Sequence, residues 1–342
     1  MSPIDHELSI SLVIWNGARW LPNLFLSLVN QTYQDYFLMI IDNDSVDDSM
    51  QIVAKFLNDY PEMAGRSRVV KNKQNLGFAR AHNQGIAWTS SPYIMLLNQD
   101  VMLAPDYLSG VMDVLRDRLE AGVAGGKILR MVSGVAPEQK NIIDSLGLKI
   151  NRAHSVSNWG EGEIDRGQYN FEKPVFGVAG TLPIYRREAL NSVSIEHEVL
   201  DEDFVSYKED VDLAWRLQLG GFSAWYTPEA VAYHSRGLAS TDNFQLQIKK
   251  RRIWPRELKI YSLVNHWAVW LKNDSLFSLL KDSPWVLWGE VKRFGYYLVF
   301  EPLTLIKAKV RFCKLFFVFY RKRKLFKNTH RVKPIDLRRW WV

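Results

Sequence analysis

Apolar runs alternate with amphipathic segments throughout residues 8–97, and this alternation limits the fold more than any other feature of the chain. The runs expected to form strands cover residues 8–14, 36–41, 68–71 and 93–97. Segments with apolar residues at helical spacing lie between them, at residues 18–30, 49–57 and 78–88. Strands that alternate with helices through short connections predict an α/β fold with a mostly parallel central sheet flanked by helices.

Polar side chains follow these strands at the points where a sheet of this kind binds its ligands. Asn16, Asp42, Asn75 and Asp100 each lie just past a predicted strand or in the loop that leads to a helix. Ligands of open α/β sheets bind beyond the carboxyl ends of the strands. Asn and Asp also favour turns, which is the alternative explanation for each residue alone. Four of them at one sheet edge indicate a binding site.

The middle of the chain has a weaker pattern. Residues 120–175 are mostly polar, and Gly122–Gly126 and Gly160–Gly167 are expected to form loops. Residues 176–181 are small and apolar, so this segment, which contains Gly180, is expected to run close to a ligand. Beyond it the sequence predicts a helix that begins at 186, a helix at 210–219, a strand at 222–226 and, after Pro228, a strand at 231–234.

Two short acidic clusters suggest the chemistry. Asp100 closes Asn98-Gln99-Asp100 after an apolar run, and Mg²⁺ or Mn²⁺ is readily shared between such a carboxylate and a diphosphate. Glu209 and Asp210 open a predicted helix, where a carboxylate can serve as a general base or can simply interact with the helix dipole. An ordinary Asp is ionised at neutral pH. Together the clusters suggest metal-assisted transfer from a phosphorylated donor.

The remaining candidates are less specific. His234 follows an apolar run, and imidazole is an acceptable Mn²⁺ ligand when its other nitrogen is held, although the residues alone favour a structural histidine. Asp212 lies two positions beyond Asp210 and is expected to be structural. The chain contains no phosphate loop, no dinucleotide fingerprint and no nucleophile elbow.

Charge is divided unevenly along the chain. Residues 245–342 contain 23 Lys and Arg against 6 Asp and Glu, whereas residues 1–244 contain 21 against 31. The same basic segment holds seven of the 13 Trp. We therefore expect a catalytic domain at 1–244 and a basic, Trp-rich helical segment at 245–342, with an anionic membrane or a nucleic acid as its partner.

The pattern within the basic segment favours the membrane. Its apolar positions recur at steps of three and four from Ile306 to Tyr320, beside a stripe of Lys and Arg, as in helices that lie in a membrane interface. Charged residues interrupt every long apolar stretch, so attachment without a span is predicted. A helical subdomain packed on the catalytic domain is the alternative, and no recognised nucleic-acid motif occurs.

The expected location follows from two further observations. The single Cys313 excludes a disulfide framework and fits a reducing compartment, and the N-terminus lacks the regions of a signal peptide. We expect a cytoplasmic protein that is peripheral on the inner face of the cell membrane.

Taken in order, the segments resemble family 2 glycosyltransferases, which are inverting enzymes with the GT-A type of nucleotide-diphospho-sugar transferase fold. The resemblance is greatest to the bacterial rhamnosyltransferase branch. It covers residues 9–17, 40–48, 75–85, 93–101, 180–190, 207–221 and 226–234.

This resemblance implies roles for individual residues. It implies that Asp42 contacts the nucleotide, that Asn16, Asn75 and Asn98 line its pocket, that Gly180 meets the donor sugar, that Asp100 and His234 bind the metal, and that Asp210 is the catalytic base with Glu209 beside it. Asn98 replaces the first acid of the family's Asp-x-Asp motif and supplies no charge. The resemblance therefore gives less support to a strict requirement for a metal ion than a complete motif would.

The implied reaction is a single displacement that inverts the anomeric carbon. A hydroxyl of a glycan or of a polyprenyl-diphosphate-linked saccharide would attack a nucleotide sugar, with rhamnose from a dTDP-sugar as the expected donor, in the synthesis of O-antigen or another cell-surface polysaccharide. The alternative is an inactive sugar-nucleotide-binding or scaffold protein of the same fold, for which Asn98 is the only support.

Overall fold

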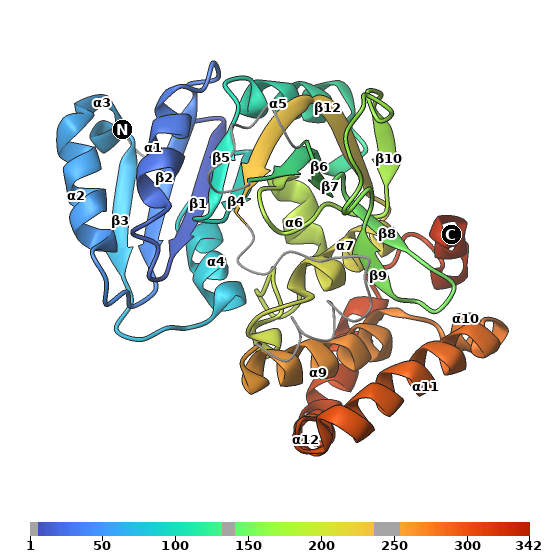
Figure 1. Cartoon of the computed structure of the whole chain (residues 1–342). Coiled ribbons are helices and arrows are strands. Elements are labelled where there is room, and N and C mark those ends of the chain that lie inside the picture. The colour runs from blue at the N-terminus through green and yellow to red at the C-terminus, as the bar shows by residue number, and fades with distance from the viewer. Residues whose placement is uncertain (1–5, 132–140, 236–253) are drawn as a thin grey trace.

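A ten-stranded sheet forms the centre of the protein, in a computed structural model that describes residues 6–131, 141–235 and 254–342 (Figure 1). Its strands are β1 (Leu8–Ile14), β2 (Tyr36–Asp42), β3 (Ser67–Lys71), β4 (Tyr93–Leu97), β5 (Val101–Leu103), β6 (Ala121–Arg130), β7 (Ile143–Ser145), β10 (Lys173–Val175), β11 (Ile184–Arg186) and β12 (Ser223–His234). The order is β10-β12-β6-β11-β4-β1-β2-β3, with β5 paired to β12 and β7 to β6. Strands β3, β2, β1 and β4 are parallel, and β11 is antiparallel to both of its neighbours.

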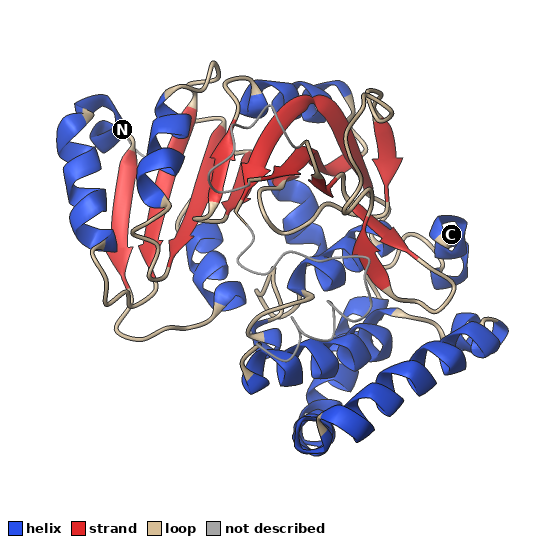
Figure 2. Cartoon of the chain, viewed as in Figure 1, coloured by secondary structure: helices blue, strands red, loops and turns tan. Residues whose placement is uncertain are grey.

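Helices cover both faces of the sheet (Figure 2). They are α1 (Leu21–Val29), α2 (Ser49–Asp59), α3 (Pro61–Gly65), α4 (Phe78–Ala87), α5 (Tyr107–Asp117), α6 (Arg187–Val193) and α7 (Glu209–Leu219). Strand β4 is buried on both sides, so its side chains alternate between two cores. Tyr93, Met95 and Leu97 pack with α1, α2 and α5, whereas Ile94 and Leu96 pack with α4, α6 and α7. The predicted α/β fold is confirmed.

Two local predictions are wrong. Gly122–Gly126 does not form a loop but lies within the buried strand β6. A Cβ at Gly126 would come within 2.0 Å of the Ala230 carbonyl oxygen, so the glycine allows a close backbone approach rather than a turn. The predicted strands at 222–226 and 231–234 form one strand, β12, in which Pro228 lies at a register shift between Thr227 and Val231. A bulge is one of the few places where a sheet accepts proline.

A C-terminal helical region packs against this domain. It comprises α9 (Arg256–Asn273), α10 (Leu276–Lys281), α11 (Ser283–Phe300), α12 (Pro302–Lys327) and the 3₁₀ helix η4 (Pro334–Trp340). Figure 1 shows α9 below the sheet and its covering helices, next to α11 and α12. The expected boundary at 244/245 and the basic cluster Lys249–Arg252 lie outside the described residues.

Buried ion pairs hold the helical region in place. Lys272 Nζ of α9 lies 2.8 Å from Asp212 Oδ1 of α7. Lys322 Nζ of α12 lies 2.7 Å from both Asp201 and Asp203, and Asp201 is itself 3 % exposed. One apolar core contains residues of α7, α9 and α12. The described part of the basic segment is therefore a packed subdomain. Within the described chain, no helix has the length and apolar character needed to cross a bilayer.

Candidate active site

Asp100 and His234 meet at the edge of the sheet. Strand β5, which follows Asp100, pairs with the end of β12, and this pairing brings His234 Nε2 within 3.3 Å of Asp100 Oδ2. The other ring nitrogen, Nδ1, lies 2.9 Å from Oδ2 of Asp144, a fully buried residue of β7. Burial alone lowers the pKa of His234, but its hydrogen bonds to Asp100 and Asp144 outweigh burial and raise the pKa to about 9.

This arrangement fits a divalent cation shared with a ligand. The described residues contain no cluster of three or more potential ligands, so Asp100 and His234 offer one oxygen and one nitrogen. Mg²⁺ and related ions commonly bind through one or two protein groups together with substrate phosphates. Asp144 fixes the ring orientation of His234 through this hydrogen bond, as the hydrogen-bond partners of metal-binding histidines usually do. Sequence reasoning missed Asp144 because it lies in the weakly patterned stretch 120–175.

A pocket of about 360 Å³ opens beside Asp100. Asn75, Asn98 and Asp100 line it, together with Val205 and Ser206 from the loop before α7. Leu258 and Tyr261 of α9 form part of its wall. The pocket is therefore built jointly by the carboxyl edge of the sheet and by the C-terminal helical region, a contribution that the sequence did not reveal.

Amide side chains brace this pocket. Asn43 Nδ2 donates to Asn75 Oδ1 at 2.9 Å, and Asn43 Oδ1 accepts from the backbone N–H of Leu76 at 3.0 Å. Gln99 exchanges two hydrogen bonds of 2.9 Å with the backbone of Trp15 and so ties the loop after β1 to the loop after β4. Asn43 and Gln99 were not predicted as site residues, although each is adjacent to one that was.

Asn16 and Asp42 do not line the pocket themselves. Asn16 adopts a left-handed conformation with φ 49°, and its Oδ1 accepts the backbone N–H of Val46 at 2.9 Å. Asp42 is fully buried at the end of β2, where Oδ1 accepts the N–H of Ser45 at 3.1 Å. Asp42 Oδ2 has no hydrogen-bond partner among the described residues. Asp42 Oδ2 also lies 3.8 Å from Lys71 Nζ, at ion-pair distance. The structure thus gives Asn16 a loop-bracing contact and places Asp42 beside a cation at the end of β3.

Asp210 is connected to the tip of β4 through a short segment. Asp210 Oδ2 accepts the backbone N–H of Gly180 at 3.0 Å. The next residue, Thr181, accepts the N–H of Asn98 through its carbonyl at 3.0 Å. A Cβ at Gly180 would lie only 3.0 Å from the Cβ of Asp210, so glycine permits this close approach. Asp210, Gly180 and Asn98 are therefore brought together around one segment.

The two acidic neighbours of Asp210 have different environments. Glu209 is 8 % exposed, and its Oε2 has no hydrogen-bond partner in the described chain. Burial, followed by the charge of Asp210, raises the pKa of Glu209 to about 8. Asp212 is fully buried between Arg216 and Lys272, at 2.9 and 2.8 Å. Asp212 therefore makes structural contacts, as the sequence predicted, and Glu209 is mostly protonated at neutral pH.

The loop before α7 is strained and is held by the helical region. Val205, Tyr207 and Lys208 have φ of 63°, 70° and 68°, which is unfavourable for side chains with a Cβ. Asn265 of α9 donates through Nδ2 to the carbonyl oxygens of Phe204, Ser206 and Tyr207, at 2.9, 3.0 and 2.7 Å. Such strain persists only where surrounding contacts over-determine the backbone. Asn265 supplies these contacts, and no local sequence signal points to it.

The sequence profile of glycosyl transferase family 2 matches residues 9–194, which is more than half of the chain. The chain belongs to this family. The glycosyltransferase is 24% identical over 248 residues to the N-acetylglucosaminyl-diphospho-decaprenol L-rhamnosyltransferase of Mycobacterium tuberculosis, with 67% of this chain and 76% of that protein covered. It is 23% identical over 230 residues to the poly-beta-1,6-N-acetyl-D-glucosamine synthase of Staphylococcus epidermidis, where the match covers 66% of this chain but only about half, 49%, of the synthase.

Solved structures agree on the fold of this glycosyltransferase. S. aureus TarS 1-349 in complex with UDP-GlcNAc superposes with a TM-score of 0.55 at 16% identity, over 98% of this chain and 92% of that one. GalNAc-T7 with UDP, GalNAc and Mn²⁺ superposes with a TM-score of 0.53 at 13% identity, over 86% of this chain and 58% of that one. The enzyme therefore has the predicted GT-A fold with a C-terminal helical region.

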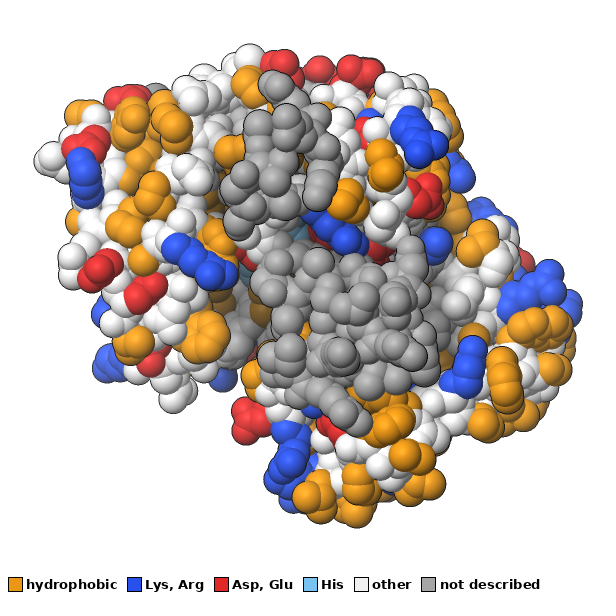
Figure 3. Space-filling model, in the orientation of Figure 1, with side chains coloured by type: hydrophobic (Ala, Val, Ile, Leu, Met, Phe, Trp, Pro, Cys, Tyr) orange, Lys and Arg blue, Asp and Glu red, His pale blue; other side chains and the backbone are white. Residues whose placement is uncertain are grey.

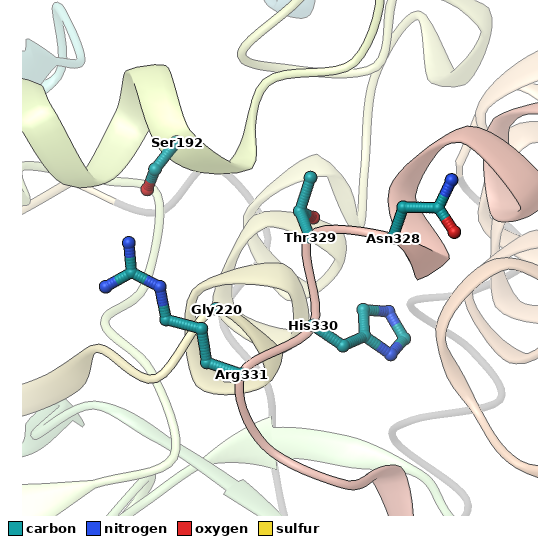
Figure 4. Close-up of a pocket in the computed structure, with 6 residues that line it drawn as sticks. All are labelled: Ser192, Gly220, Asn328, Thr329, His330 and Arg331. Atoms are coloured by element: carbon teal, nitrogen blue, oxygen red, sulfur yellow. The ribbon is translucent and has the colours of Figure 1, made fainter.

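A second pocket, of about 330 Å³, lies away from these groups in the fold of the glycosyltransferase. Figure 4 shows Ser192 and Gly220 facing the segment Asn328–Arg331 that follows α12. Among the residues that the structure describes, its lining includes no carboxylate and none of the predicted site residues. Arg331 packs over the ring of Phe222 at 5.8 Å, which indicates a structural joint between α7 and the chain terminus.

Proposed function

We propose that this family 2 glycosyltransferase is an inverting enzyme that transfers a sugar from a nucleotide-sugar donor to the hydroxyl of a glycan or lipid-linked saccharide during cell-surface polysaccharide synthesis. One observation carries the proposal. Asp210 accepts a hydrogen bond from Gly180, and the next residue, Thr181, accepts one from Asn98. Asn98 lies two positions before Asp100, which contacts His234. A base and a diphosphate-binding group therefore flank one segment, as an in-line displacement requires.

Asp210 is proposed as the general base. It accepts the proton of the acceptor hydroxyl while that oxygen attacks the anomeric carbon from the face opposite the diphosphate, which inverts the configuration. The N–H groups of Gly180 and Val211 hold its two oxygens, at 3.0 and 2.8 Å, and so fix the orientation of the carboxylate. Glu209, whose pKa is raised by burial, stays largely protonated beside it and adds little negative charge.

Donor binding is assigned to the pocket beside Asp100. Asn75 and Asn98 are proposed to bind the nucleotide within it. Asp42 Oδ2, which accepts no hydrogen bond from a described residue but lies 3.8 Å from Lys71 Nζ, is proposed to accept one from the base or ribose. Gly180 is proposed to meet the donor sugar through its backbone. Asp100 and His234 would hold Mg²⁺ or Mn²⁺, which when bound neutralises charge on the departing diphosphate.

Rhamnose from a dTDP-sugar is our proposed donor. The mycobacterial relative carries rhamnosyltransferase in its name, and that name describes an acceptor with a diphospho-decaprenol group. The staphylococcal synthase and TarS are instead linked by name or title to N-acetylglucosamine.

A panel of dTDP-rhamnose, UDP-GlcNAc, UDP-GalNAc and GDP-mannose, with Mn²⁺ and a crude lipid acceptor, tests the proposed donor through release of nucleoside diphosphate. Rapid release from dTDP-rhamnose alone is expected. Equal release from every donor, or none from any, would refute the assignment.

We also propose that the helical region attaches the enzyme to an anionic membrane surface on the cytoplasmic side. Large apolar side chains are exposed along α11 and α12, among them Trp288 at 62% and Phe317 at 77%. Figure 3 shows hydrophobic and basic side chains side by side over this part of the molecule. Interfacial helices combine these two kinds of side chain.

A further inference from the structure

A groove of about 420 Å³ lies between α9 and α12, outside the site already described. Four cations line it: Arg256 from α9, and Lys307, Arg311 and Lys314 from α12. Glu257 is its only acidic lining residue among those the structure describes. The groove therefore carries a strong positive potential that would attract an anion.

The cations of this groove have no hydrogen-bond or ion-pair partner among the residues that the structure describes. Arg311 Nε is buried and has no hydrogen-bond partner in the described chain, while its guanidinium carbon lies 4.8 Å from the centre of the Tyr261 ring. A buried donor without a partner costs free energy, and a phosphate oxygen would satisfy it.

The rest of the groove is apolar. Ile260 is 9% exposed, and Ile306 and Val310 are 56% and 50% exposed. Ile306 and Val310 begin the row of apolar side chains that continues along α12 to Phe317. A ligand with an anionic head and a long hydrocarbon chain would match this combination, because its chain could follow the row toward a membrane.

Tyr261 connects the groove to the donor pocket. It lines both cavities, and the donor pocket also contains Asn98 and Asp100. An anionic group held in the groove would therefore lie on the other side of one tyrosine from the bound nucleotide sugar.

We propose that the groove between α9 and α12 binds the diphosphate of a prenyl-diphosphate-linked acceptor and the first part of its hydrocarbon chain. This inference rests on the proposed function and identifies where the acceptor lipid is held. Arg311 and Lys307 bind the phosphate oxygens, and Arg suits phosphate because its planar donor fork can form two parallel hydrogen bonds. Ile306 and Val310 contact the chain.

The test is binding of farnesyl diphosphate to the full chain, measured by isothermal titration in EDTA so that no divalent cation bridges a diphosphate to Asp100. Arg311→Gln and Lys307→Gln are expected to weaken binding by roughly tenfold each, because each removes one charge-assisted contact. Lys324→Gln is the matched control, since it removes a cation from the same helix that does not line the groove. Circular dichroism establishes that each variant is folded.

Two further probes separate the sources of the anion. Inorganic pyrophosphate is expected to bind at least about tenfold more weakly than farnesyl diphosphate, since it lacks the apolar chain. Equal affinity would overturn the proposal in favour of a free-anion site. Loss of binding to phosphatidylglycerol vesicles in Arg311→Gln, with farnesyl diphosphate unaffected, would overturn it in favour of general membrane contact.

Failure of this inference can be distinguished from failure of the proposed function. Displacement of farnesyl diphosphate by dTDP would mean that the probe occupies the donor pocket. This result would overturn the proposal that the groove binds the acceptor diphosphate. Because binding is measured without turnover, a chain that fails the donor panel but binds farnesyl diphosphate through Arg311 would refute the proposed reaction and support the groove.

Discussion

His234 Nε2 lies 3.3 Å from Asp100 Oδ2, because the short strand after Asp100 pairs with the strand that ends at His234. The buried carboxylate of Asp144 holds the opposite ring nitrogen at 2.9 Å. The imidazole is therefore fixed from both sides before any ligand arrives. The role of this preorganisation can therefore be tested by substituting Asp144, which leaves both proposed metal ligands, Asp100 and His234, in place.

Asp144→Asn is expected to weaken Mn²⁺ binding by roughly 10–100-fold, because partners of ligating histidines set the ring orientation and basicity. The measurement is electron paramagnetic resonance of free Mn²⁺, titrated with enzyme in the presence of nucleoside diphosphate. Asp113→Asn, at an exposed position of α5, is the control and should leave the affinity unchanged. Unaltered affinity in Asp144→Asn would contradict a role for His234 in metal binding.

Asp210 and Asp212 lie two positions apart on α7 and should respond differently to substitution. Asp210→Asn should reduce kcat by roughly 10²–10⁴-fold through loss of the general base, with donor affinity and thermal stability retained. Asp212→Ala should lower the free energy of unfolding by about 3–5 kcal/mol, because it leaves Arg216 and Lys272 buried without their carboxylate. Nucleoside diphosphate release and urea denaturation measure the two effects. Wild-type kcat in Asp210→Asn would remove the proposed base.

The raised pKa of Glu209 predicts a pH-dependent stability. Burial raises this pKa from its usual 4.5 to about 8, so the folded protein binds more protons than the unfolded chain between these values. The stability contributed by the protonated form is complete below pH 4.5 and is lost progressively as the pH rises toward 8. Glu209→Gln should remove this loss and gain on the order of a few kcal/mol relative to wild type by pH 8.

Urea denaturation of both proteins at several pH values between 5 and 8.5 measures this difference. Glu188→Gln is the matched control, since Glu188 is exposed in the first turn of α6. A constant difference between Glu209→Gln and wild type at all pH values would show that Glu209 titrates normally.

Asn265→Ala should impair turnover more than folding. It removes three hydrogen bonds to the strained loop before α7, and the proposed base follows this loop directly. We expect kcat to fall by about tenfold in Asn265→Ala. We also expect Asp210→Asn to lower kcat by a smaller factor in the Asn265→Ala background than in the wild-type protein. Ser262→Ala, on the same helix, is the control. If kcat is unchanged in Asn265→Ala, the loop does not depend on α9.

Membrane attachment through α11 predicts a specific effect of one tryptophan. Trp288→Ala should weaken partition into phosphatidylglycerol vesicles by about tenfold, because a large exposed apolar side chain is lost from the interface. Flotation measures the bound fraction across a salt series. Trp88→Ala, which changes an exposed tryptophan just after α4, far from the helical region in sequence, should have no effect. Equal loss in both variants would contradict attachment through the helical region.

The first part of the fold was predictable because its signals are local. Strands β1, β2 and β4 are buried on both faces and so consist of continuous apolar runs. Strand β6 could not be recognised, because its Gly122, Gly125 and Gly126 serve contacts with distant side chains and the nearby backbone of Ala230. The local sequence pattern does not indicate these close contacts, because they depend on residues that are distant in the chain.

The site was predictable only where a residue type is tied to a strand end. Asp100 and Asn75 follow strands β4 and β3, and both line the pocket. Asp144 and Asn265 were missed because each acts through a partner far away in the chain, His234 and the loop 204–207. Asn16 lies in the expected loop, yet its side chain contacts Val46 instead of the pocket.

Leu258 and Tyr261 of α9 form one wall of the cavity that contains Asn98 and Asp100. A hybrid enzyme that joined the first 244 residues to the C-terminal helices of a relative would therefore combine its own sheet edge with another protein's wall at the proposed donor pocket. Attempts to swap sugar preference between relatives would need to move α9 together with the sheet-edge loops, because the proposed donor pocket is lined by both parts of the chain.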